Sequence, residues 1–244
     1  MAQNEIVLFD LPSRPPCKSW SLNPWKTRFI LNYKNIPYHT EWLEYPDIEA
    51  RLSPHLPPKP PPDTPYTIPT ILLPSGSYLM DSKVIAAHLE SLYPSPSLHL
   101  SSAFQSKIEA LMPKVMTTLA PIYILLIPAN LLNEVSVPYW NKSRAEWVGM
   151  DLDTLAEKHG GEKAWEKFTP VVQEVTALLK ENADGPYFLG KEVSYADFVW
   201  GGFLICCKRI AEREIYEEVL ERSGDRGVHE ALLKGVGKWA VRDD

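Results

Sequence analysis

The chain has 244 residues and a formal charge of -6, with 45% hydrophobic and 23% charged residues. This composition is typical of a water-soluble globular protein of one or two domains. No basic run is longer than a dipeptide, which argues against nucleic acid or an anionic membrane surface as a partner. Three cysteines are too few and too unevenly spaced for a disulfide framework, so we expect a reducing, cytoplasmic location.

No segment of the sequence is predicted to cross a membrane or to direct secretion. The N-terminus lacks a basic segment followed by a long apolar one, because the apolar run at residues 6–8 is too short. The richest apolar stretch, residues 119–132, is interrupted by Pro121 and Pro128 and is shorter than a membrane span. It therefore predicts a buried helix.

The first 45 residues predict a strand, a helix and a second strand. Residues 5–10 form a short apolar run typical of a buried strand, and a polar loop with prolines follows. From about residue 23 the pattern becomes helical, and Pro24 suits the first turn of that helix. The apolar face of the helix would consist of Trp25, Phe29, Ile30 and Leu31, with Lys26 and Arg28 off that face. Residues 38–45 favour a second strand, and a strand, a crossing helix and a strand imply parallel pairing.

Residues 54–65 are rich in proline, which lacks a backbone N–H and fixes φ, so no helix continues through them. A short helical stretch, residues 47–53, precedes them. We expect a semi-rigid loop on the rim of a ligand groove. A linker or a ligand for an SH3 domain is the alternative.

The most informative block is residues 66–82, in which two short strands are followed by the start of a helix. A proline inside a strand-like run, here Pro69, marks either an edge strand or a cis turn. A cis bond would leave the backbone of Ile68 unpaired and available to the main chain of a peptide ligand. Asp81 and Ser82 stand where the helix begins, and free N–H groups there favour a carboxylate. The alternative is that Pro69 only marks an edge strand and that Asp81 and Ser82 only cap the helix.

Beyond that block the pattern is helical to the end of the chain. The helix that begins at Asp81 ends near Leu92, and a short linker with prolines follows. We predict two domains, an α/β domain over residues 1–93 and an all-α domain over residues 101–244. Further helices are expected at residues 103–132, 141–158, 162–182 and 195–211, with one or two short ones after Glu214.

The segment from Gly190 to Asp197 contains a capping box. Ser194 can cap the N–H three residues on, and the Asp197 side chain can reach back to Ser194. Val193 and Phe198 stand at the positions of a hydrophobic staple. This pattern predicts a structural role at the start of a buried helix.

The order of these elements resembles the cytosolic glutathione transferases over nearly the whole chain. The resemblance rests on the β-α-β start, the Pro69 strand, the capped helix at Asp81-Ser82 and the segment from Gly190 to Asp197. It implies a thioredoxin-like N-terminal domain that binds glutathione, and an all-helical C-terminal domain that forms the hydrophobic substrate site. It also implies glutathione as co-substrate with no metal, a homodimer, and a folding role for Ser194 and Asp197.

The same resemblance places the residue that activates the thiol in the loop before the first helix. The glutathione thiol has an ordinary pKa of about 8.5, so a hydroxyl donor, backbone N–H groups and a helix N-terminus must favour the thiolate. Many family members have Ser or Cys five positions before a Lys or Arg, and Ser21 stands in that register with Lys26 and Arg28. We therefore expect Ser21 to donate to the thiolate, with Asn23 as a second donor. Leu22 departs from the family, in which proline is common at that position.

Two alternatives compete with this assignment. Ser21 or Asn23 would merely cap the helix, although a cap at this position also points toward the ligand. Cys17 would form a mixed disulfide with glutathione, as in omega-like members, but it lies four residues too early for that register. Cys206 and Cys207 lie in an apolar helix and are expected to be inert core residues.

The resemblance also implies how glutathione is held. Ile68, followed by Pro69, would pair its backbone with the cysteinyl part. Asp81 would bind the γ-glutamyl ammonium, and Ser82 its carboxylate. The glycyl carboxylate needs a cation or an amide from the preceding loop. The candidates are Lys59 and His55.

Three segments, residues 20–28, 41–48 and 66–69, further resemble the fungal etherase-related transferases, including the FuA class. This resemblance implies thiolate attack on an aromatic or aryl-ether electrophile in a site between residues 103–132 and 141–158. The aromatic residues available to line it, which could equally be core residues, are Tyr123, Tyr139, Trp140 and Trp147. The alternatives are a ligandin that carries aromatic metabolites, a tailoring enzyme of secondary metabolism, and a regulatory protein on the same fold.

Overall fold

A four-stranded sheet forms the centre of the N-terminal part of the computed structural model, which describes residues 5–242. Its strands are β1 (Ile6–Asp10), β2 (Tyr38–Trp42), β3 (Thr70–Leu72) and β4 (Tyr78–Met80). The spatial order is β2-β1-β3-β4, and β1 runs parallel to β2 and antiparallel to β3. The parallel pair that the sequence predicted is therefore confirmed.

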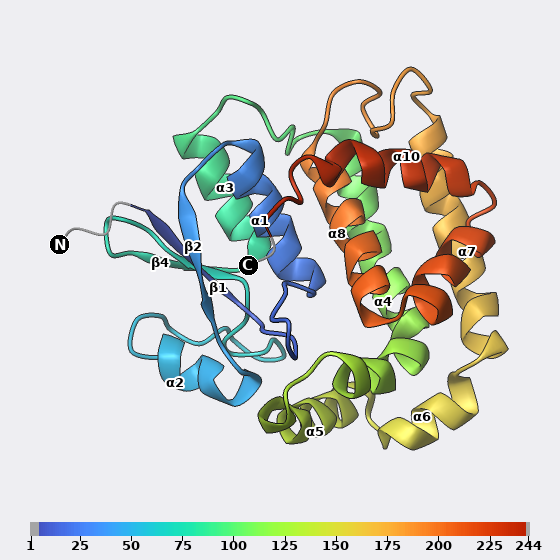
Figure 1. Ribbon diagram of the computed structural model, residues 1–244, viewed down its shortest axis with the longest axis horizontal. Helices are drawn as coiled ribbons and strands as arrows, with labels where there is room; N and C mark the ends of the chain where they lie inside the picture. Colours follow the sequence, from blue (N-terminus) through green and yellow to red (C-terminus); the bar gives the residue numbers. More distant parts are fainter. Residues whose placement is uncertain (1–4, 243–244) are drawn as a thin grey trace.

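Three helices belong to this sheet. α1 (Leu22–Tyr33) and α3 (Ser82–Leu92) lie side by side between the sheet and the helical half of the molecule (Figure 1). The short α2 (Ile48–Leu52) follows a 3-10 turn at Tyr45–Asp47. The Arg51 guanidinium of α2 lies over the ring of Phe9, 4.7 Å from its centroid, and so joins α2 to β1. This is a thioredoxin-like domain.

The rest of the chain is a helical bundle. α4 (Ala103–Asn130) and α8 (Tyr195–Ile210) stand at its centre, with α7 (Glu162–Lys180) outside them (Figure 1). α5 (Val137–Val148) and α6 (Leu152–His159) form one end, and α10 (Arg226–Gly237) crosses the other. The shorter elements are a 3-10 turn at Glu134–Ser136, a π-helix at Glu212–Glu217 and α9 (Glu218–Arg222). A thioredoxin-like domain followed by an all-helical domain is the fold class that the sequence predicted.

α4 runs for 28 residues and contains Pro113, Pro121 and Pro128. The helix is therefore longer than the most apolar stretch of the sequence. By length and composition alone this helix is apolar enough to cross a membrane. In this fold it packs against α6, α7 and α8, and Ile108 and Ile124 are fully buried. The expectation of a buried helix is confirmed for the face that packs against the other helices. The argument that the apolar segment is too short to cross a membrane was wrong, because the whole helix is long enough.

The helix expected at residues 141–158 is two helices. α5 ends at Val148 because Gly149 adopts a left-handed conformation with φ 73°, and the N–H groups of Gly149 and Met150 both bond to the Ala145 carbonyl. Glycine adopts this conformation without steric cost, so it ends the helix. α6 then starts at Leu152, where the Asp151 side chain accepts a hydrogen bond from the N–H of Thr154.

The capping box before α8 is confirmed and extends further than its sequence motif. One carboxylate oxygen of Asp197 accepts hydrogen bonds from the N–H and the hydroxyl of Ser194, both at 2.7 Å. The other accepts from the N–H of Phe188 at 2.9 Å. Asp197 is fully buried, and burial raises the pKa of its carboxyl to about 6. The motif therefore fixes both the start of α8 and the loop before it.

The two halves of the molecule meet along α1 and α8. Phe29 and Phe198 stack with ring centroids 5.1 Å apart, a contact worth about 0.5–1.5 kcal/mol beyond its buried area. Gly202 permits the close approach, because an added Cβ would lie 3.3 Å from the Cβ of Trp25 and 3.4 Å from the Leu22 carbonyl oxygen. This packing fixes the N-terminus of α1 against the helical half.

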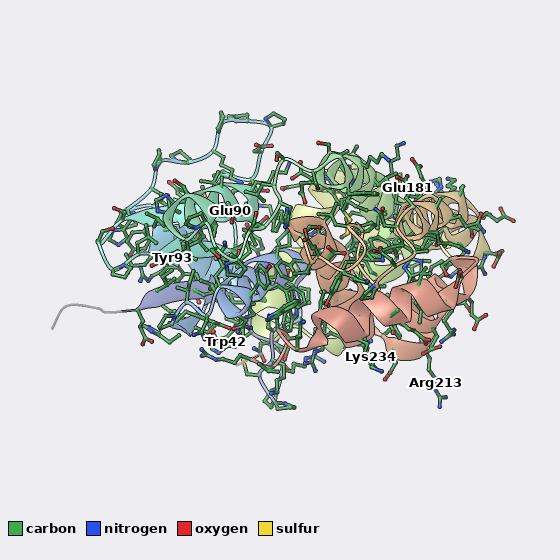
Figure 2. All side chains as sticks on the ribbon, turned by 90° about the horizontal axis from the view of Figure 1, so that it is seen from above. Trp42, Glu90, Tyr93, Glu181, Arg213 and Lys234 are labelled. Atoms are coloured by element: carbon green, nitrogen blue, oxygen red, sulfur yellow. The ribbon has the colours of Figure 1, made fainter. Side chains whose placement is uncertain are left out.

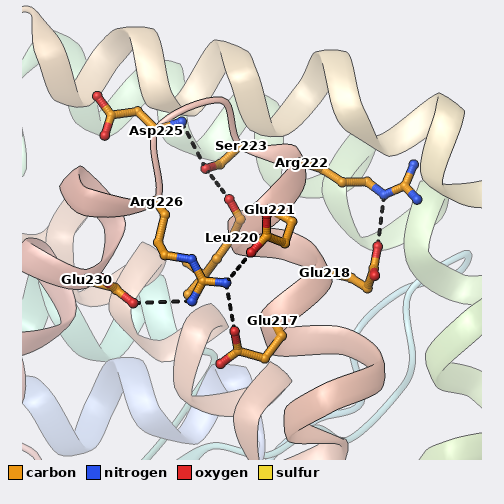
Figure 3. A network of polar contacts seen from close by, with 9 residues as sticks. All are labelled: Glu217, Glu218, Leu220, Glu221, Arg222, Ser223, Asp225, Arg226 and Glu230. Atoms are coloured by element: carbon orange, nitrogen blue, oxygen red, sulfur yellow. Dashed lines mark hydrogen bonds and ion pairs between the residues drawn. The ribbon is translucent and has the colours of Figure 1, made fainter.

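The surface around α9 and α10 is held by charged pairs, shown in Figure 3. Arg226 forms ion pairs with Glu217, Glu221 and Glu230 at 2.7, 2.6 and 3.4 Å. Arg222 pairs with Glu218 on the preceding turn. Such exposed pairs contribute about 0–1 kcal/mol each, so this network belongs to the surface and not to a site.

Candidate active site

A cavity of about 450 Å³ lies where the two halves of the molecule meet. Its walls come from the start of α1, from the turn after β2, and from α4, α5 and α8. The polar residues at one end are Ser21, Asn23, Lys26, Lys83 and Glu109. The apolar wall includes Met112, Leu119, Ile127, Phe203, Ile210 and Ile215.

Ser21 occupies the N-cap position of α1, in extended backbone conformation with φ -77° and ψ 135°. Its side chain makes no capping hydrogen bond, although serine at this position usually does. Ser21 is one of the residues that line the cavity. The capping alternative is therefore not realised through the Ser21 side chain, which leaves its hydroxyl for a ligand.

A buried ion pair, which the sequence did not indicate, joins α1 to the end of β1. Nε of Arg28 lies 2.8 Å from Oδ2 of Asp10, and both side chains are fully buried. Ser19 donates to the same carboxylate, and the Leu11 N–H donates to its other oxygen. Burial raises the pKa of Asp10, and Arg28 opposes that shift. The sequence placed Arg28 off the buried face of the helix, but Arg28 is fully buried and faces β1.

Asn23 and Lys26 form a second polar group at the start of α1. Nζ of Lys26 donates to Oδ1 of Asn23 at 2.8 Å, which leaves the amide hydrogens of Asn23 as donors. Burial lowers the pKa of Lys26 to about 8, against the opposing charges of Asp81 and Glu109. The sequence used Lys26 only to set the register, so its place in the cavity was not foreseen.

The Ile68–Pro69 peptide bond is cis. Pro69 directly precedes β3, which lies between β1 and β4, so the edge-strand alternative is wrong. The carbonyl of Pro69 accepts a hydrogen bond from the N–H of Asp81. Among residues 5–242 no group hydrogen-bonds to the backbone of Ile68. This backbone is therefore free for a ligand main chain.

Asp81 caps α3 from an uncommon backbone conformation. Its φ of 88° is unfavourable for a residue with a side chain, and such conformations cluster at ligand sites. Its carboxylate accepts from the Lys83 N–H and from Nζ of Lys59, both at 2.9 Å. Burial would raise the pKa of Asp81, but the Lys59 and Lys83 hydrogen bonds outweigh it and lower the pKa.

The structure gives the contacts of three further residues named from the sequence. Lys59 was expected as a cation for the glycyl carboxylate, but here it is paired with Asp81. His55 stacks on Tyr78 with ring centroids 4.3 Å apart. Ser82 is buried, and its carbonyl accepts a hydrogen bond from the Tyr195 hydroxyl of α8. The N-terminus of α3 is thereby tied to the wall of the cavity.

The cysteines fall into two environments. Cys17 is exposed in the loop before α1, and partial burial raises the pKa of its thiol. Cys206 and Cys207 are buried on α8, and burial raises the pKa of Cys206 to about 12. No thiol here has the lowered pKa of a reactive cysteine. Within residues 5–242 no His, Cys, Asp and Glu groups are clustered to hold a metal.

The aromatic candidates divide between the cavity and a second hollow. Tyr123 and Trp140 line the cavity. Tyr139 and Trp147 line an outer hollow together with residues 62–65 of the proline-rich loop. The loop therefore lies on a rim, as expected, and Tyr123 borders both spaces.

Family models match nearly the whole chain. Residues 20–92 match the model described as glutathione S-transferase, N-terminal domain, and residues 100–239 match its C-terminal counterpart. Among curated proteins, the glutathione S-transferase-like protein ustS of Aspergillus flavus is 30% identical, over 97% of this chain and 91% of its own. The glutathione S-transferase-like protein OpS6 of Beauveria bassiana is 27% identical, over 73% of this chain and 71% of its own.

Solved structures agree with these matches. A glutathione S-transferase of Ceriporiopsis subvermispora, in complex with glutathione, is 35% identical with a TM-score of 0.84, covering 99% of this chain and 100% of its own. GSTFuA3 of Phanerochaete chrysosporium is 28% identical with a TM-score of 0.85, covering 98% and 99%. The resemblance to the FuA type that the sequence indicated is confirmed.

Proposed function

The chain belongs to the glutathione S-transferase family, and we propose that it activates the thiol of glutathione with Ser21 for attack on an aromatic or aryl-ether electrophile. The observation that carries this proposal is the Ser21 hydroxyl, which makes no capping bond and opens onto an apolar cavity. Other residues of the same domain suit the cysteinyl and γ-glutamyl parts of glutathione.

The binding half of the proposal rests on β3 and α3. The free backbone of Ile68 suits the cysteinyl main chain, which would add to the sheet as an extended peptide does. The N-terminus of α3 at Asp81 and Ser82 suits the γ-glutamyl group, because free N–H groups and the helix dipole favour a carboxylate. The Asp81 carboxylate would bind the γ-glutamyl ammonium while it remains paired with Lys59.

The chemical half rests on the start of α1. The Ser21 hydroxyl and the Asn23 amide are neutral donors that stabilise a thiolate, and Lys26 adds positive charge in the same end of the cavity. The thiolate sulfur would attack the electrophilic carbon, a C–S bond would form, and chloride or an aryloxide would leave with the bonding electrons. The thiol proton goes to solvent.

The second substrate would occupy the apolar part of the cavity. A volume of about 450 Å³ suits a small organic molecule, and aromatic side chains line it beside aliphatic ones. An aromatic acceptor fits this lining. The homodimer and the cytoplasmic location expected of the family are also part of the proposal, and light scattering and cell fractionation test them.

Calorimetric titration with glutathione tests the binding half. We expect saturable binding to the wild type. In the variant Asp81→Ala/Ser82→Ala the Kd of glutathione should rise at least about tenfold, since each lost charge-assisted hydrogen bond costs about 1.5–3 kcal/mol. Asp151→Ala is the control, because the Asp151 carboxylate also caps a helix, α6, but lies outside the cavity. Equal weakening in both variants would mean that loss of a helix cap, and not loss of a glutathione contact, explains the result.

A panel of acceptors tests the chemical half. We expect glutathione adducts with activated aryl halides or release of phenol from aryl ethers, measured by product chromatography. Binding of glutathione and of aromatic ligands without any adduct would instead identify the protein as a carrier. Absence of glutathione binding would overturn the whole proposal.

A further inference from the structure

One charged side chain in the cavity has no role in the function proposed above. Arg144 lies on α5 and lines both the cavity and the outer hollow under the proline-rich loop. Met116 and Tyr123 also line both spaces, so these three residues form the wall between them. Within residues 5–242 no carboxylate pairs with its guanidinium, although Asp63 and Glu146 line the outer hollow.

Aromatic rings hold this guanidinium in place. Its central carbon lies 4.2 Å from the centroid of the Trp140 ring and 5.7 Å from that of Tyr45. Trp140 is fixed in turn, because it is buried and its ring N–H donates to the Ile124 carbonyl at 2.9 Å. One edge nitrogen of Arg144 donates to the Ser143 hydroxyl at 3.3 Å. Stacking uses the faces of the guanidinium and leaves its other N–H groups for a planar anion.

Two phenol groups lie near the guanidinium. The charge of Arg144 lowers the pKa of both Tyr45 and Tyr123, although burial has the larger effect and raises both. Both hydroxyls therefore stay protonated and able to donate. Within residues 5–242 the Tyr123 hydroxyl has no hydrogen-bond partner, and Tyr123 is buried. Tyr123 lines the cavity, so its hydroxyl can donate to a ligand there.

The charge of the cavity favours an anion at this place. Its lining holds three cations, Lys26, Lys83 and Arg144, against one carboxylate, Glu109. Glu109 is already paired with Lys83 at 2.7 Å. Lys26 stands with Ser21 at the end assigned to glutathione, so Arg144 is the cation that remains for the second substrate.

We propose that Arg144, with the hydroxyls of Tyr123 and Tyr45, binds a carboxylate, and that the cavity therefore selects aromatic acceptors that carry one. The aromatic part of such an acceptor lies along the apolar wall, and its carboxylate bonds to the edge of the guanidinium. This inference rests on the proposed function in one respect, that the bound molecule is an acceptor of glutathione. The preference for a carboxylate can be measured by binding, without turnover.

The binding test compares two probes of nearly equal shape, 2-naphthoate and the neutral 2-naphthamide, by calorimetry with the whole protein. We expect the wild type to bind the carboxylate more tightly. Arg144→Met should weaken 2-naphthoate about 10- to 100-fold and 2-naphthamide less than about threefold, because a charge-assisted pair is lost only with the anion. Arg144→Lys should recover part of the loss, since lysine keeps the charge but not the planar fork.

Arg213→Met is the matched control. Arg213 is exposed and projects away from the body of the molecule in Figure 2, and it does not line the cavity. Its removal changes the net charge by the same amount, so it should leave both affinities unchanged. Equal loss of both probes in Arg144→Met, or equal loss of 2-naphthoate in Arg213→Met, would overturn the proposal.

Turnover separates this inference from the function that it extends. 4-Chloro-3-nitrobenzoate and its amide are both open to attack by the thiolate at the carbon that bears chlorine, with loss of chloride. We expect Arg144→Met to lower kcat/KM for the acid about 10- to 100-fold and to leave the Kd of glutathione unchanged. No turnover with a retained naphthoate preference would overturn the transferase mechanism alone. A loss of glutathione affinity in Arg144→Met would place Arg144 in the glutathione site and overturn the carboxylate proposal.

Discussion

The two walls of the cavity differ in the groups that they offer to a ligand. The thioredoxin-like wall lines the cavity at Ser21, the N-terminal end of α1. The same domain offers a free backbone at Ile68 and a second helix end at Asp81, each within a short stretch of sequence. The helical wall offers apolar side chains and one group of polar atoms, at Tyr123 and Arg144, from separate helices. The first arrangement is fixed by local geometry and suits one invariant co-substrate. The second depends on side-chain identity alone, and it is the wall on which acceptor preference can vary.

The largest effect should come from breaking the support of the first wall. Asp10→Ala removes the carboxylate beside Arg28 and leaves a buried positive charge, so the free energy of unfolding should fall by about 3–5 kcal/mol. Urea denaturation measures it. Glu41→Ala is the control, because its pair with Arg51 is partly exposed and should cost at most about 1 kcal/mol. Equal losses would show that the buried pair does not support the wall.

The next effect is chemical and concerns Ser21. Ser21→Ala should lower kcat about 100- to 1000-fold with a change in the KM of glutathione below about threefold, because the donor acts on the thiolate and the backbone contacts remain. Steady-state kinetics with an aryl halide measures it. A kcat within about twofold of the wild type would remove Ser21 from the mechanism.

A smaller effect distinguishes charge from backbone recognition on the same wall. Burial lowers the pKa of Lys26 to about 8, so its positive charge is present below that pH and lost above it. Affinity for S-methylglutathione, which forms no thiolate, should fall about three- to tenfold as pH rises through 8. Lys26→Met should lack that part of the decrease. If the affinity of both proteins changed with pH in the same way, the charge of Lys26 would not contribute to binding of this ligand.

The smallest effect is expected at the cysteines. Cys17→Ala should leave turnover within about twofold, because the pKa of the exposed Cys17 thiol is raised and not lowered. In the folded protein a maleimide should label Cys17 alone, with Cys206 and Cys207 labelled only after unfolding. Mass spectrometry of the labelled peptides measures it. Loss of turnover in Cys17→Ala would favour a thiol mechanism over the hydroxyl.

The contrast between the walls also explains what the sequence could predict. Pro69, the Asp81-Ser82 cap and the Ser194 capping box each lie within one short segment, so residue order alone indicates their geometry. Ser21 could be placed by spacing, and the structure adds that its side chain makes no cap. Local sequence was therefore sufficient to indicate these features.

Contacts between distant segments could not be predicted in the same way. The partner of Arg28 is at the end of β1, and Lys59 of the proline-rich loop meets Asp81. The group around Arg144 joins Tyr45 after β2 to Tyr123 on α4. No period or spacing relates these positions. An Asp at the end of a buried strand, as at Asp10, was the one available signal, because such a carboxylate must find a partner.

The pKa of the thiol of bound glutathione is the measurement that tests this account most directly. The ultraviolet absorbance of the thiolate is followed against pH for glutathione bound to the wild type and to Ser21→Ala. We predict a pKa at least about one unit below the free value of about 8.5 in the wild type, and a return toward that value in the variant. The same pKa in both proteins would contradict the claim that the Ser21 hydroxyl stabilises the thiolate at the mouth of the apolar cavity.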